Sequence, residues 1–196
     1  MQGEVILPLQ GRRFYELEVI GYRKSLPLMK VSDRLYIAYF DSLGDVEFLS
    51  HCAKLLADRL RGADVLFTSE TKGVPLVHEI AKILGHKQYV IARKRRLPFM
   101  EDPITVSYKP ITSDRPQTLT IDGRYARVLE GRKVAIVDDI VSTKETLNAL
   151  EELVRRAGGI VYKKAAILVE GRVHDDVEHL GVLPLFVEDS AGPQRG

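Results

Sequence analysis

The feature that most constrains this chain is a run of four apolar residues that leads directly into two carboxylates. The run covers residues 134–137, and Asp138 and Asp139 follow it. A continuous apolar stretch of this length, bounded by turn residues, predicts a strand that is covered on both faces, as in a parallel sheet. Acids at the carboxyl end of such a strand lie in the crevice where open α/β sheets bind ligands. The stretch therefore predicts a parallel sheet with a binding site at this strand.

A hydroxyl-rich turn follows the two acids. Ser142, Thr143 and Thr146 carry hydroxyls, and a helical pattern begins near Lys144. The first turn of a helix presents unpaired N–H groups at the positive end of its dipole, so the turn and the helix together predict a phosphate cradle. The acids repel a phosphate but suit the hydroxyls of a sugar beside it. A phosphorylated ribose fits both halves of the motif.

A second loop of this kind lies earlier in the chain. Residues 64–68 are predicted as a strand, and residues 74–84 as a helix that ends at Gly85. Between them, Gly73 allows a close turn and Lys72 supplies a cation in front of the helix amides. By itself this is an ordinary loop between a strand and a helix, but its place before the acidic strand favours a role in binding.

Four consecutive cations end the next predicted strand, at residues 88–92. They are Arg93, Lys94, Arg95 and Arg96. A run of this kind is most often a solvated surface. Here the run ends a strand beside a predicted polyphosphate site, which favours a binding role for Arg93 and Lys94 and leaves Arg95 and Arg96 as surface charge.

Residues 134–147 resemble the signature of type I phosphoribosyltransferases that binds 5-phosphoribosyl 1-pyrophosphate (PRPP). The resemblance implies that the two acids bind the ribose hydroxyls and that the turn binds the 5-phosphate. The family usually has two glycines where this chain has Lys144 and Glu145, and their loss predicts weaker binding or a changed role. We expect Lys144 to compensate through its charge and Glu145 to point to solvent. The implied ribose and phosphate site consists of Asp138, Asp139, Ser142, Thr143, Lys144, Glu145 and Thr146.

Two further stretches are similar to adenine phosphoribosyltransferases. The tetrapeptide at residues 70–73 is similar to their Glu-Ala-Arg-Gly, and residues 93–98 to their Arg-Lys…Leu-Pro pattern. The resemblance implies that both stretches bind pyrophosphate, through Glu70, Thr71, Lys72, Gly73, Arg93 and Lys94. The implied catalytic residues are Asp138, Asp139, Lys94 and Tyr108.

A long arm, with three prolines in residues 99–117, lies between the basic run and the acidic strand. Arms of this length inside a domain are usually functional or disordered. Its place, at about residues 95–120, matches the flexible hairpin that closes over PRPP in type I enzymes, and closure would exclude water from the reactive sugar. Glu101, Tyr108 and Lys109 are the candidates for entering the site.

The order of the predicted elements favours one domain with an α/β fold. Strands alternate with helices across residues 64–169, which predicts a doubly wound, mostly parallel sheet. Residues 62–170 would form the PRPP-binding core of a single domain that spans residues 1–196. Strands at residues 14–22 and 35–40, with Pro27 as turn material between them, predict either a small hood over the base, at about residues 1–45, or a ribbon that completes the core or a dimer contact.

Composition excludes several other classes of protein. The chain is 45% hydrophobic and 29% charged, as in a soluble globular protein, and no apolar run approaches the ~20 residues of a membrane span. A net charge of +2 is too small for a general nucleic-acid surface. The single cysteine, Cys52, permits no internal disulfide. The first residues lack the profile of a signal peptide, so we expect a cytoplasmic protein.

The resemblance also implies a reaction. The expected enzyme transfers the 5-phosphoribosyl group of PRPP to a nucleobase, adenine first, and releases pyrophosphate. Mg²⁺ would be held mainly by PRPP oxygens without a protein cage, and the chain would act as a homodimer. One alternative is xanthine or hypoxanthine as acceptor; the other is a PRPP-sensing regulator without transferase activity, which Lys144 and Glu145 motivate. The regulator ranks lower, because the segment before Asp64 is predicted to form strands and a helix and not a DNA-binding domain.

Overall fold

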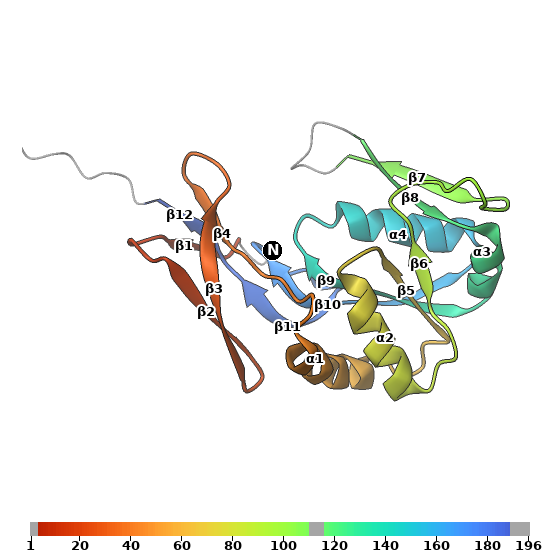
Figure 1. Ribbon diagram of the computed structural model, residues 1–196, viewed down its shortest axis with the longest axis horizontal. Coiled ribbons are helices and arrows are strands. Elements are labelled where there is room, and N and C mark those ends of the chain that lie inside the picture. The colour runs from red at the N-terminus through yellow and green to blue at the C-terminus, as the bar shows by residue number, and fades with distance from the viewer. Residues whose placement is uncertain (1–3, 110–115, 189–196) are drawn as a thin grey trace, which may run out of the picture.

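A five-stranded parallel sheet forms the centre of the molecule (Figure 1). The computed structural model describes residues 4–109 and 116–188. The strand order is β11-β10-β9-β5-β6, and every neighbouring pair is parallel. The predicted doubly wound sheet is therefore confirmed. Its strands are β5 (Val65–Ser69), β6 (Val90–Ala92), β9 (Lys133–Val141), β10 (Ile160–Glu170) and β11 (Glu178–Leu183).

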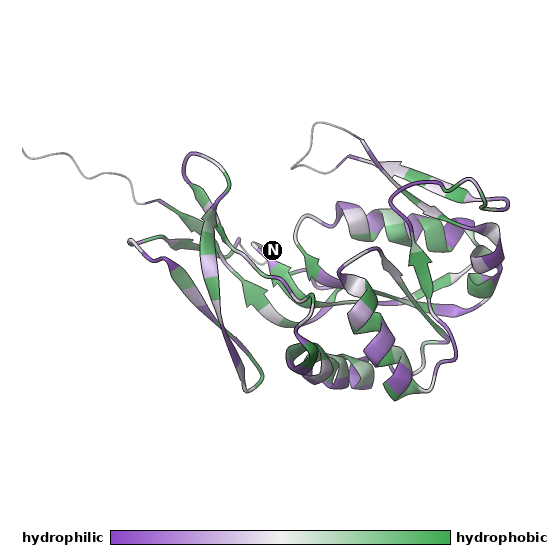
Figure 2. Ribbon diagram, in the orientation of Figure 1, coloured by the Kyte–Doolittle hydropathy of each residue, from purple (hydrophilic) through white to green (hydrophobic). Residues whose placement is uncertain are grey.

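Helices cover both faces of this sheet (Figure 1). Side chains alternate along β9: Ala135 and Val137 belong to the apolar core beneath α1 and α2, whereas Val134 and Ile136 belong to the core beneath α4. This is why the strand is apolar at every position, and Figure 2 shows the same hydrophobic colour along the central strands. The helices are α1 (Val46–Arg59), α2 (Gly73–Leu84), α3 (Gly123–Leu129) and α4 (Glu145–Arg156).

A second five-stranded sheet lies beside the first and joins the two ends of the chain (Figure 1). One detail of the prediction was wrong, because Pro27 lies inside a strand and not in a turn. The chain leaves the central sheet at Pro184, and the strand that follows lies within the second sheet. Leu17, Leu26 and Phe186 join the core beneath α1. In order, the strands are β1 (Ile6–Pro8), β12 (Leu185–Val187), β4 (Leu35–Ala38), β3 (Tyr22–Lys30) and β2 (Phe14–Val19).

The predicted arm contains an antiparallel hairpin, β7 (Ile104–Tyr108) and β8 (Gln117–Ile121). Val106 and Leu119 are buried in the core that includes α4. The backbone of Arg93 exchanges two hydrogen bonds with Thr120, of 2.7 and 2.8 Å, so the base of the hairpin is fixed to the end of β6. Residues 110–115 of the expected mobile arm lie outside the described residues.

Helix α1 begins at a cap that also ties it to the N-terminal sheet. The Asp45 carboxylate accepts a hydrogen bond from Phe48 N at 3.1 Å and another from Lys24 Nζ at 2.7 Å. Ser42, which has the spacing of a capping box with Asp45, does not cap the helix and is fully buried. Across the described residues, none of the helices combines the length and the apolar character needed to cross a membrane.

We predict that Asp45→Ala lowers the free energy of unfolding by about 1–2 kcal/mol, because an N-cap acceptor is lost at a partly buried site. Urea unfolding measures this directly. The control is Asp58→Ala in the same helix, whose exposed pair with Arg61 contributes less than about 1 kcal/mol. Equal losses in the two variants would contradict the role of the cap.

Candidate active site

The two acids lie inside β9 and not after it, because the strand continues to Val141. Asp139 is only 7% exposed, and its backbone N–H donates to Asp138 Oδ1 at 2.9 Å. Among the described atoms, Asp139 Oδ2 is buried without a hydrogen-bond partner. A buried, unsatisfied carboxylate oxygen is costly, so this atom marks a place where a ligand can contribute a donor.

The protonation of these acids depends on their surroundings. Burial raises the pKa of Asp138 above the ordinary carboxyl value, and the neighbouring Asp139 raises it further. Burial also raises the pKa of Asp139. Two adjacent carboxylates of low exposure cannot both ionise without cost. A ligand that brings hydroxyl donors or positive charge would favour their ionised forms.

The turn after β9 lines a cavity of about 300 Å³. The first N–H groups of α4 have no acceptor within the helix, so they remain available to an anion. Thr146 Oγ1 donates to the Tyr108 hydroxyl at 3.4 Å, which connects the turn to the hairpin. The cavity is lined by Asp138, Ile140, Val141, Ser142, Thr143, Lys144, Glu145, Thr146, Leu147 and Glu170. We call this cavity the cradle.

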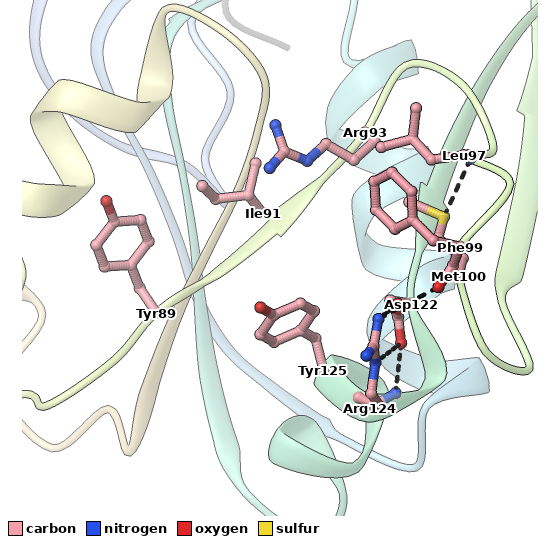
Figure 3. A pocket seen from close by; sticks show the side chains of 9 residues that line it. All are labelled: Tyr89, Ile91, Arg93, Leu97, Phe99, Met100, Asp122, Arg124 and Tyr125. Carbon is pink, nitrogen blue, oxygen red and sulfur yellow. Dashed lines mark hydrogen bonds and ion pairs between the residues drawn. The ribbon is translucent and has the colours of Figure 1, made fainter.

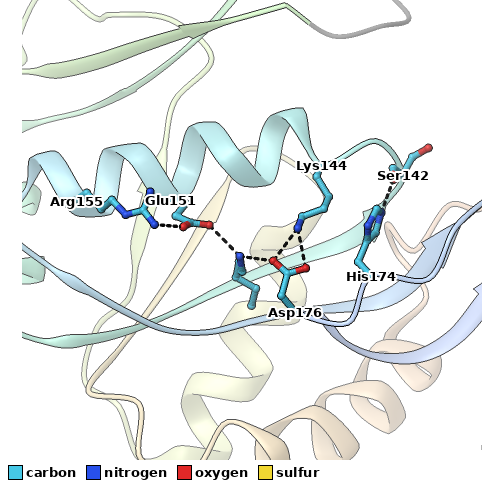
Figure 4. Close-up of polar contacts among 7 residues, drawn as sticks. Ser142, Lys144, Glu151, Arg155, His174 and Asp176 are labelled. Atoms are coloured by element: carbon cyan, nitrogen blue, oxygen red, sulfur yellow. Dashed lines mark hydrogen bonds and ion pairs between the residues drawn. The ribbon is translucent and has the colours of Figure 1, made fainter. Parts of the chain in front are cut away.

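Lys144 adopts the backbone conformation of a glycine. Its φ of 69° and ψ of 0° are left-handed, which costs an L residue about 1–2 kcal/mol. Its ammonium lies 2.7 Å from both carboxylate oxygens of Asp176 (Figure 4). The charge that we expected to replace the glycines is therefore engaged by another side chain.

Glu145 does not point to solvent as expected. Its carboxylate accepts a hydrogen bond from the Thr143 hydroxyl and lines the cradle. The physical reason is the helix dipole, which favours a negative charge in the first turn of α4. A phosphate would compete with this carboxylate for the same hydroxyl and the same helix end.

The second loop meets the acids in a neighbouring cavity of about 190 Å³. The cavity contains every expected pyrophosphate residue except Gly73 and Arg93, and Tyr108 enters it from the end of β7. Glu101 does not reach it, because it pairs with Arg124 at 3.6 Å instead, and Lys109 does not line it. The cavity is lined by Ser69, Glu70, Thr71, Lys72, Lys94, Tyr108, Gln117, Asp138, Asp139 and Thr146.

Gly73 is required by close packing at the start of α2. A Cβ at this position would lie 2.2 Å from Thr68 Oγ1 and 3.4 Å from Asp138 Oδ1. No side chain fits there unless its neighbours shift. The glycine therefore brings the helix amides next to the acidic strand, and Lys72 immediately precedes them, 3.5 Å from Asp41 Oδ1.

Glu70 organises the basic end of β6. Its carboxylate accepts hydrogen bonds from Lys94 N at 2.7 Å and from the Arg93 guanidinium at 3.1 Å. Burial raises the pKa of Glu70, but these two bonds outweigh burial and hold the pKa below its usual value. Glu70 therefore positions the turn that presents Lys94.

Arg93 and Lys94 face different cavities. Lys94 lines the cavity with the acids, whereas Arg93 lines another of about 300 Å³, beside Tyr89, Leu97 and Tyr125 (Figure 3). Successive side chains at a strand end point to opposite sides, which explains the separation. Arg93 thus borders a second cavity, while its guanidinium contacts Glu70 of the expected pyrophosphate site.

Three residues outside the expected site lie around the cradle. Glu170 ends β10 and lines the cradle; burial raises its pKa, and a hydrogen bond with Ser142 opposes the shift. His174 donates from Nε2 to the Ser142 carbonyl at 2.8 Å. Asp176 binds Lys144. The available signal was their position after a strand of the parallel sheet, where ligand sites form.

Within the described residues, no group of three or more His, Cys, Asp or Glu side chains is arranged to hold a metal ion. The carboxylates of Asp138 and Asp139 nevertheless line the cavity between the two loops. A hard cation with oxygen ligands fits there if a phosphorylated ligand supplies most of those ligands.

Comparison with known proteins places these features in a family. Residues 41–175 match the phosphoribosyl transferase domain. The chain is 31% identical over 156 residues to the purine biosynthesis transcriptional repressor PurR of Bacillus subtilis, covering 76% of this chain and 53% of that protein. It is 30% identical over 121 residues to the adenine phosphoribosyltransferase of Mycolicibacterium vanbaalenii, covering 61% and 66%. The chain thus spans about half the length of the first of these relatives.

A solved structure is also similar. The crystal structure of adenine phosphoribosyltransferase from Thermoanaerobacter pseudethanolicus aligns with a TM-score of 0.59 and 27% identity, over 71% of this chain and 83% of that chain. The adenine phosphoribosyltransferase of Rhodothermus marinus aligns over 87% of this chain with the same TM-score of 0.59, and at 20% identity it supports the fold alone.

We predict that the double variant Asp138→Asn, Asp139→Asn is more stable than the original chain, and that its advantage grows from about pH 4 to about pH 7. The folded protein holds these carboxyls protonated above their ordinary pKa of 3.8, so it loses stability as rising pH ionises them. Amides do not titrate. Urea unfolding across this range measures the difference, and an advantage that shrinks with rising pH would contradict the raised pKa values.

Proposed function

The chain belongs to the phosphoribosyl transferase domain family, and from that premise we propose that it transfers the 5-phosphoribosyl group of PRPP to a nitrogen of a purine base. The observation that carries this proposal is the buried, unpartnered Asp139 oxygen, which lies in a cavity between two loops suited to phosphates. Both ends of PRPP carry phosphates, and its ribose carries a pair of hydroxyls. The order of cradle, acids and second loop follows the order of these groups in PRPP.

The acids hold the ribose in this proposal. Hydroxyl groups at positions 2 and 3 donate to the carboxylates of Asp138 and Asp139, so a partner reaches the buried oxygen of Asp139. Bound hydroxyls and nearby cations favour the ionised acids, whose pKa values burial raises in the free protein. Ribose binding is therefore accompanied by proton release.

The two loops hold the two phosphate groups. The 5-phosphate lies in the cradle, where it receives donors from Ser142, Thr143 and the first turn of α4. Pyrophosphate lies against Lys72, Lys94 and the first turn of α2, which Gly73 brings close.

During transfer the bond from ribose C1 to pyrophosphate breaks, a bond forms from C1 to the base nitrogen, and that nitrogen loses its proton. Cations at the leaving pyrophosphate stabilise the negative charge that develops there.

A Mg²⁺ ion fits this arrangement as a partner of PRPP. Its ligands would be pyrophosphate and ribose oxygens, with Asp138 and Asp139 nearby, because the described residues offer no metal cage of their own. The ion supplies positive charge on the departing oxygens. Asp138 and Asp139 orient the sugar hydroxyls that share it.

The acceptor base lies between the cradle and the N-terminal sheet. A cavity of about 280 Å³ opens there, lined in part by Glu170, Arg172 and His174 from the segment that starts at the end of β10, and by Leu185. Glu170 borders both this cavity and the cradle, so its carboxyl group lies between phosphate and base. We propose adenine as the first acceptor, because residues 70–73 and 93–98 are similar to adenine phosphoribosyltransferases. Xanthine and hypoxanthine are the next candidates. The N-terminal strands would form the hood.

The hairpin completes the site. Tyr108 joins the cavity that holds the acids and contacts Thr146 of the cradle. Closure of the arm over PRPP would exclude water from the sugar centre and prevent hydrolysis. Tyr108 and Gln117 are described arm residues that line this cavity and are placed to take part in that step.

We also propose that the protein works in the cytoplasm as a homodimer. Phe99 and Tyr125 are 69% and 54% exposed and line the same cavity as Arg93 (Figure 3). Exposed aromatic residues around a cavity are typical of protein interfaces. A second copy of the chain would cover them.

A second candidate function is a PRPP-binding regulator without transferase activity. The Glu145 carboxylate already occupies the Thr143 hydroxyl, and Lys144 is bound to Asp176, so the cradle differs from a glycine-rich one at two adjacent positions. The similarity to a transcriptional repressor is in accord with this alternative. Retained binding without turnover would distinguish it.

We predict that the protein releases pyrophosphate when it is incubated with PRPP, Mg²⁺ and adenine. Parallel reactions with hypoxanthine, guanine, xanthine, uracil and orotate identify the acceptor. PRPP binding without pyrophosphate release for any base would reject the transferase and support the regulator. No PRPP binding at all would reject both functions.

A matched pair of variants tests the pyrophosphate site in the same assay. Lys94→Ala should lower kcat by roughly 10- to 100-fold, because it removes a cation from the leaving group. Arg95→Ala removes an exposed charge from the same basic run and should leave kcat within about twofold. Equal losses would mean that the run acts only through its overall charge.

A further inference from the structure

The cradle is connected to an ion-pair network outside it (Figure 4). Asp176 accepts hydrogen bonds from Lys144 Nζ at 2.7 Å and from Lys164 Nζ at 2.6 Å. Lys164 Nζ also donates to Glu151 of α4 at 2.9 Å. The network therefore joins the cradle, β10, α4 and the segment before β11, and only one of its members, Lys144, belongs to the cradle itself.

The backbone of Lys144 needs outside support. Its left-handed conformation is one that glycine adopts freely and that other L residues rarely adopt. Without an anchor, the chain at this position would prefer other conformations, and the first amides of α4 would then point elsewhere. The ion pair with Asp176 supplies an anchor, because the lysine side chain reaches both oxygens of one carboxylate only from a restricted set of backbone positions.

Asp176 is itself held in place. Its carboxylate is only about half exposed and has two lysines against it. Burial raises the pKa of Asp176, but the bonds from Lys144 and Lys164 outweigh this and hold the pKa far below its usual value. The anchor thus stays charged at neutral pH, and Lys164 contacts its carboxylate directly.

We propose that Asp176 is a positioning residue, which holds Lys144 in the left-handed turn that a glycine would otherwise provide and so keeps the cradle ready for a phosphate. The inference rests on the proposed function only in that the ligand of the cradle is the 5-phosphate of PRPP. Asp176 repels a phosphate by its own charge, so its contribution to binding acts through Lys144. Lys144 in turn contributes its backbone geometry and not a direct ionic contact.

The experiment is a double-mutant cycle on PRPP affinity, measured by calorimetry with Mg²⁺ present. The variants are Asp176→Asn, Lys144→Gly and the two combined. Glu151→Gln is the matched control, because it also changes a carboxylate partner of Lys164 to an amide but leaves Lys144 and Asp176 untouched. Glycine removes the need for an anchor and keeps the turn.

The expected result is a loss of affinity of roughly 5- to 10-fold for Asp176→Asn, which corresponds to about 1.0–1.4 kcal/mol. In the Lys144→Gly background the same change should have an effect of less than about twofold. Glu151→Gln should also stay within about twofold. Tighter binding by Asp176→Asn would overturn the proposal, because it would show that Lys144 binds phosphate directly once Asp176 releases it. Equal losses in both backgrounds, or a loss that Glu151→Gln reproduces, would also overturn it.

Amide hydrogen exchange at the start of α4 provides a readout that needs no ligand, because the Asn148 N–H donates to the Lys144 carbonyl at 2.8 Å. Asp176→Asn should speed exchange in this segment when Lys144 is present and leave it unchanged when glycine replaces the lysine. If the original chain binds no PRPP, the proposed function fails, and the exchange data still decide the positioning role. Exchange that does not respond to Asp176→Asn would overturn that role independently.

Discussion

Two adjacent carboxylates of low exposure in the central strand are the constraint on which the rest of the site depends. Asp138 and Asp139 lie where β9 is covered on both faces, and one of their oxygens has no partner among the described atoms. Such groups are costly to bury, and the surrounding elements supply compensation at the same edge of the sheet. The first turns of α2 and α4 point positive dipole ends toward it, and Lys72 and Lys94 add charge. The positive groups that compensate for the cost of burying the two carboxylates also suit a ligand that carries phosphates and hydroxyls.

The site is built by apposition of loops and not by one motif. The glycine at residue 73 lets α2 approach the acids, Glu70 turns the end of β6 so that Lys94 faces them, and Tyr108 arrives from the hairpin. The first two contacts follow from the rule that parallel strands end at one edge, whereas Tyr108 belongs to a separate antiparallel hairpin. Lys144 departs from that pattern. There a side chain and its ion-pair partner hold a turn that glycine, which has no side chain, adopts elsewhere without support.

The central sheet and the acidic site could be predicted from the sequence because their signals are local. The apolar run before Asp138 and the helical spacing after Lys144 each reflect one element and its burial. The second sheet was only partly predictable: Pro27 reads as turn material, yet it lies in β3. Helix α3 was missed because it is only seven residues long. The partners of Lys144, Glu145 and Arg93 could not be predicted at all, since Asp176, Thr143 and the cavity beside Tyr125 are tertiary contacts that leave no periodic trace.

The most direct test of this account is a calorimetric titration of PRPP with Mg²⁺ into the original chain and into the variant Asp138→Asn, Asp139→Asn. The amides keep the shape of the side chains and remove the charge that holds the ribose hydroxyls. The account predicts that the original chain binds PRPP and releases protons on binding, and that the folded variant binds at least about tenfold more weakly, a difference of about 1.4 kcal/mol. Equal affinity in a folded variant would contradict the central role of the two acids.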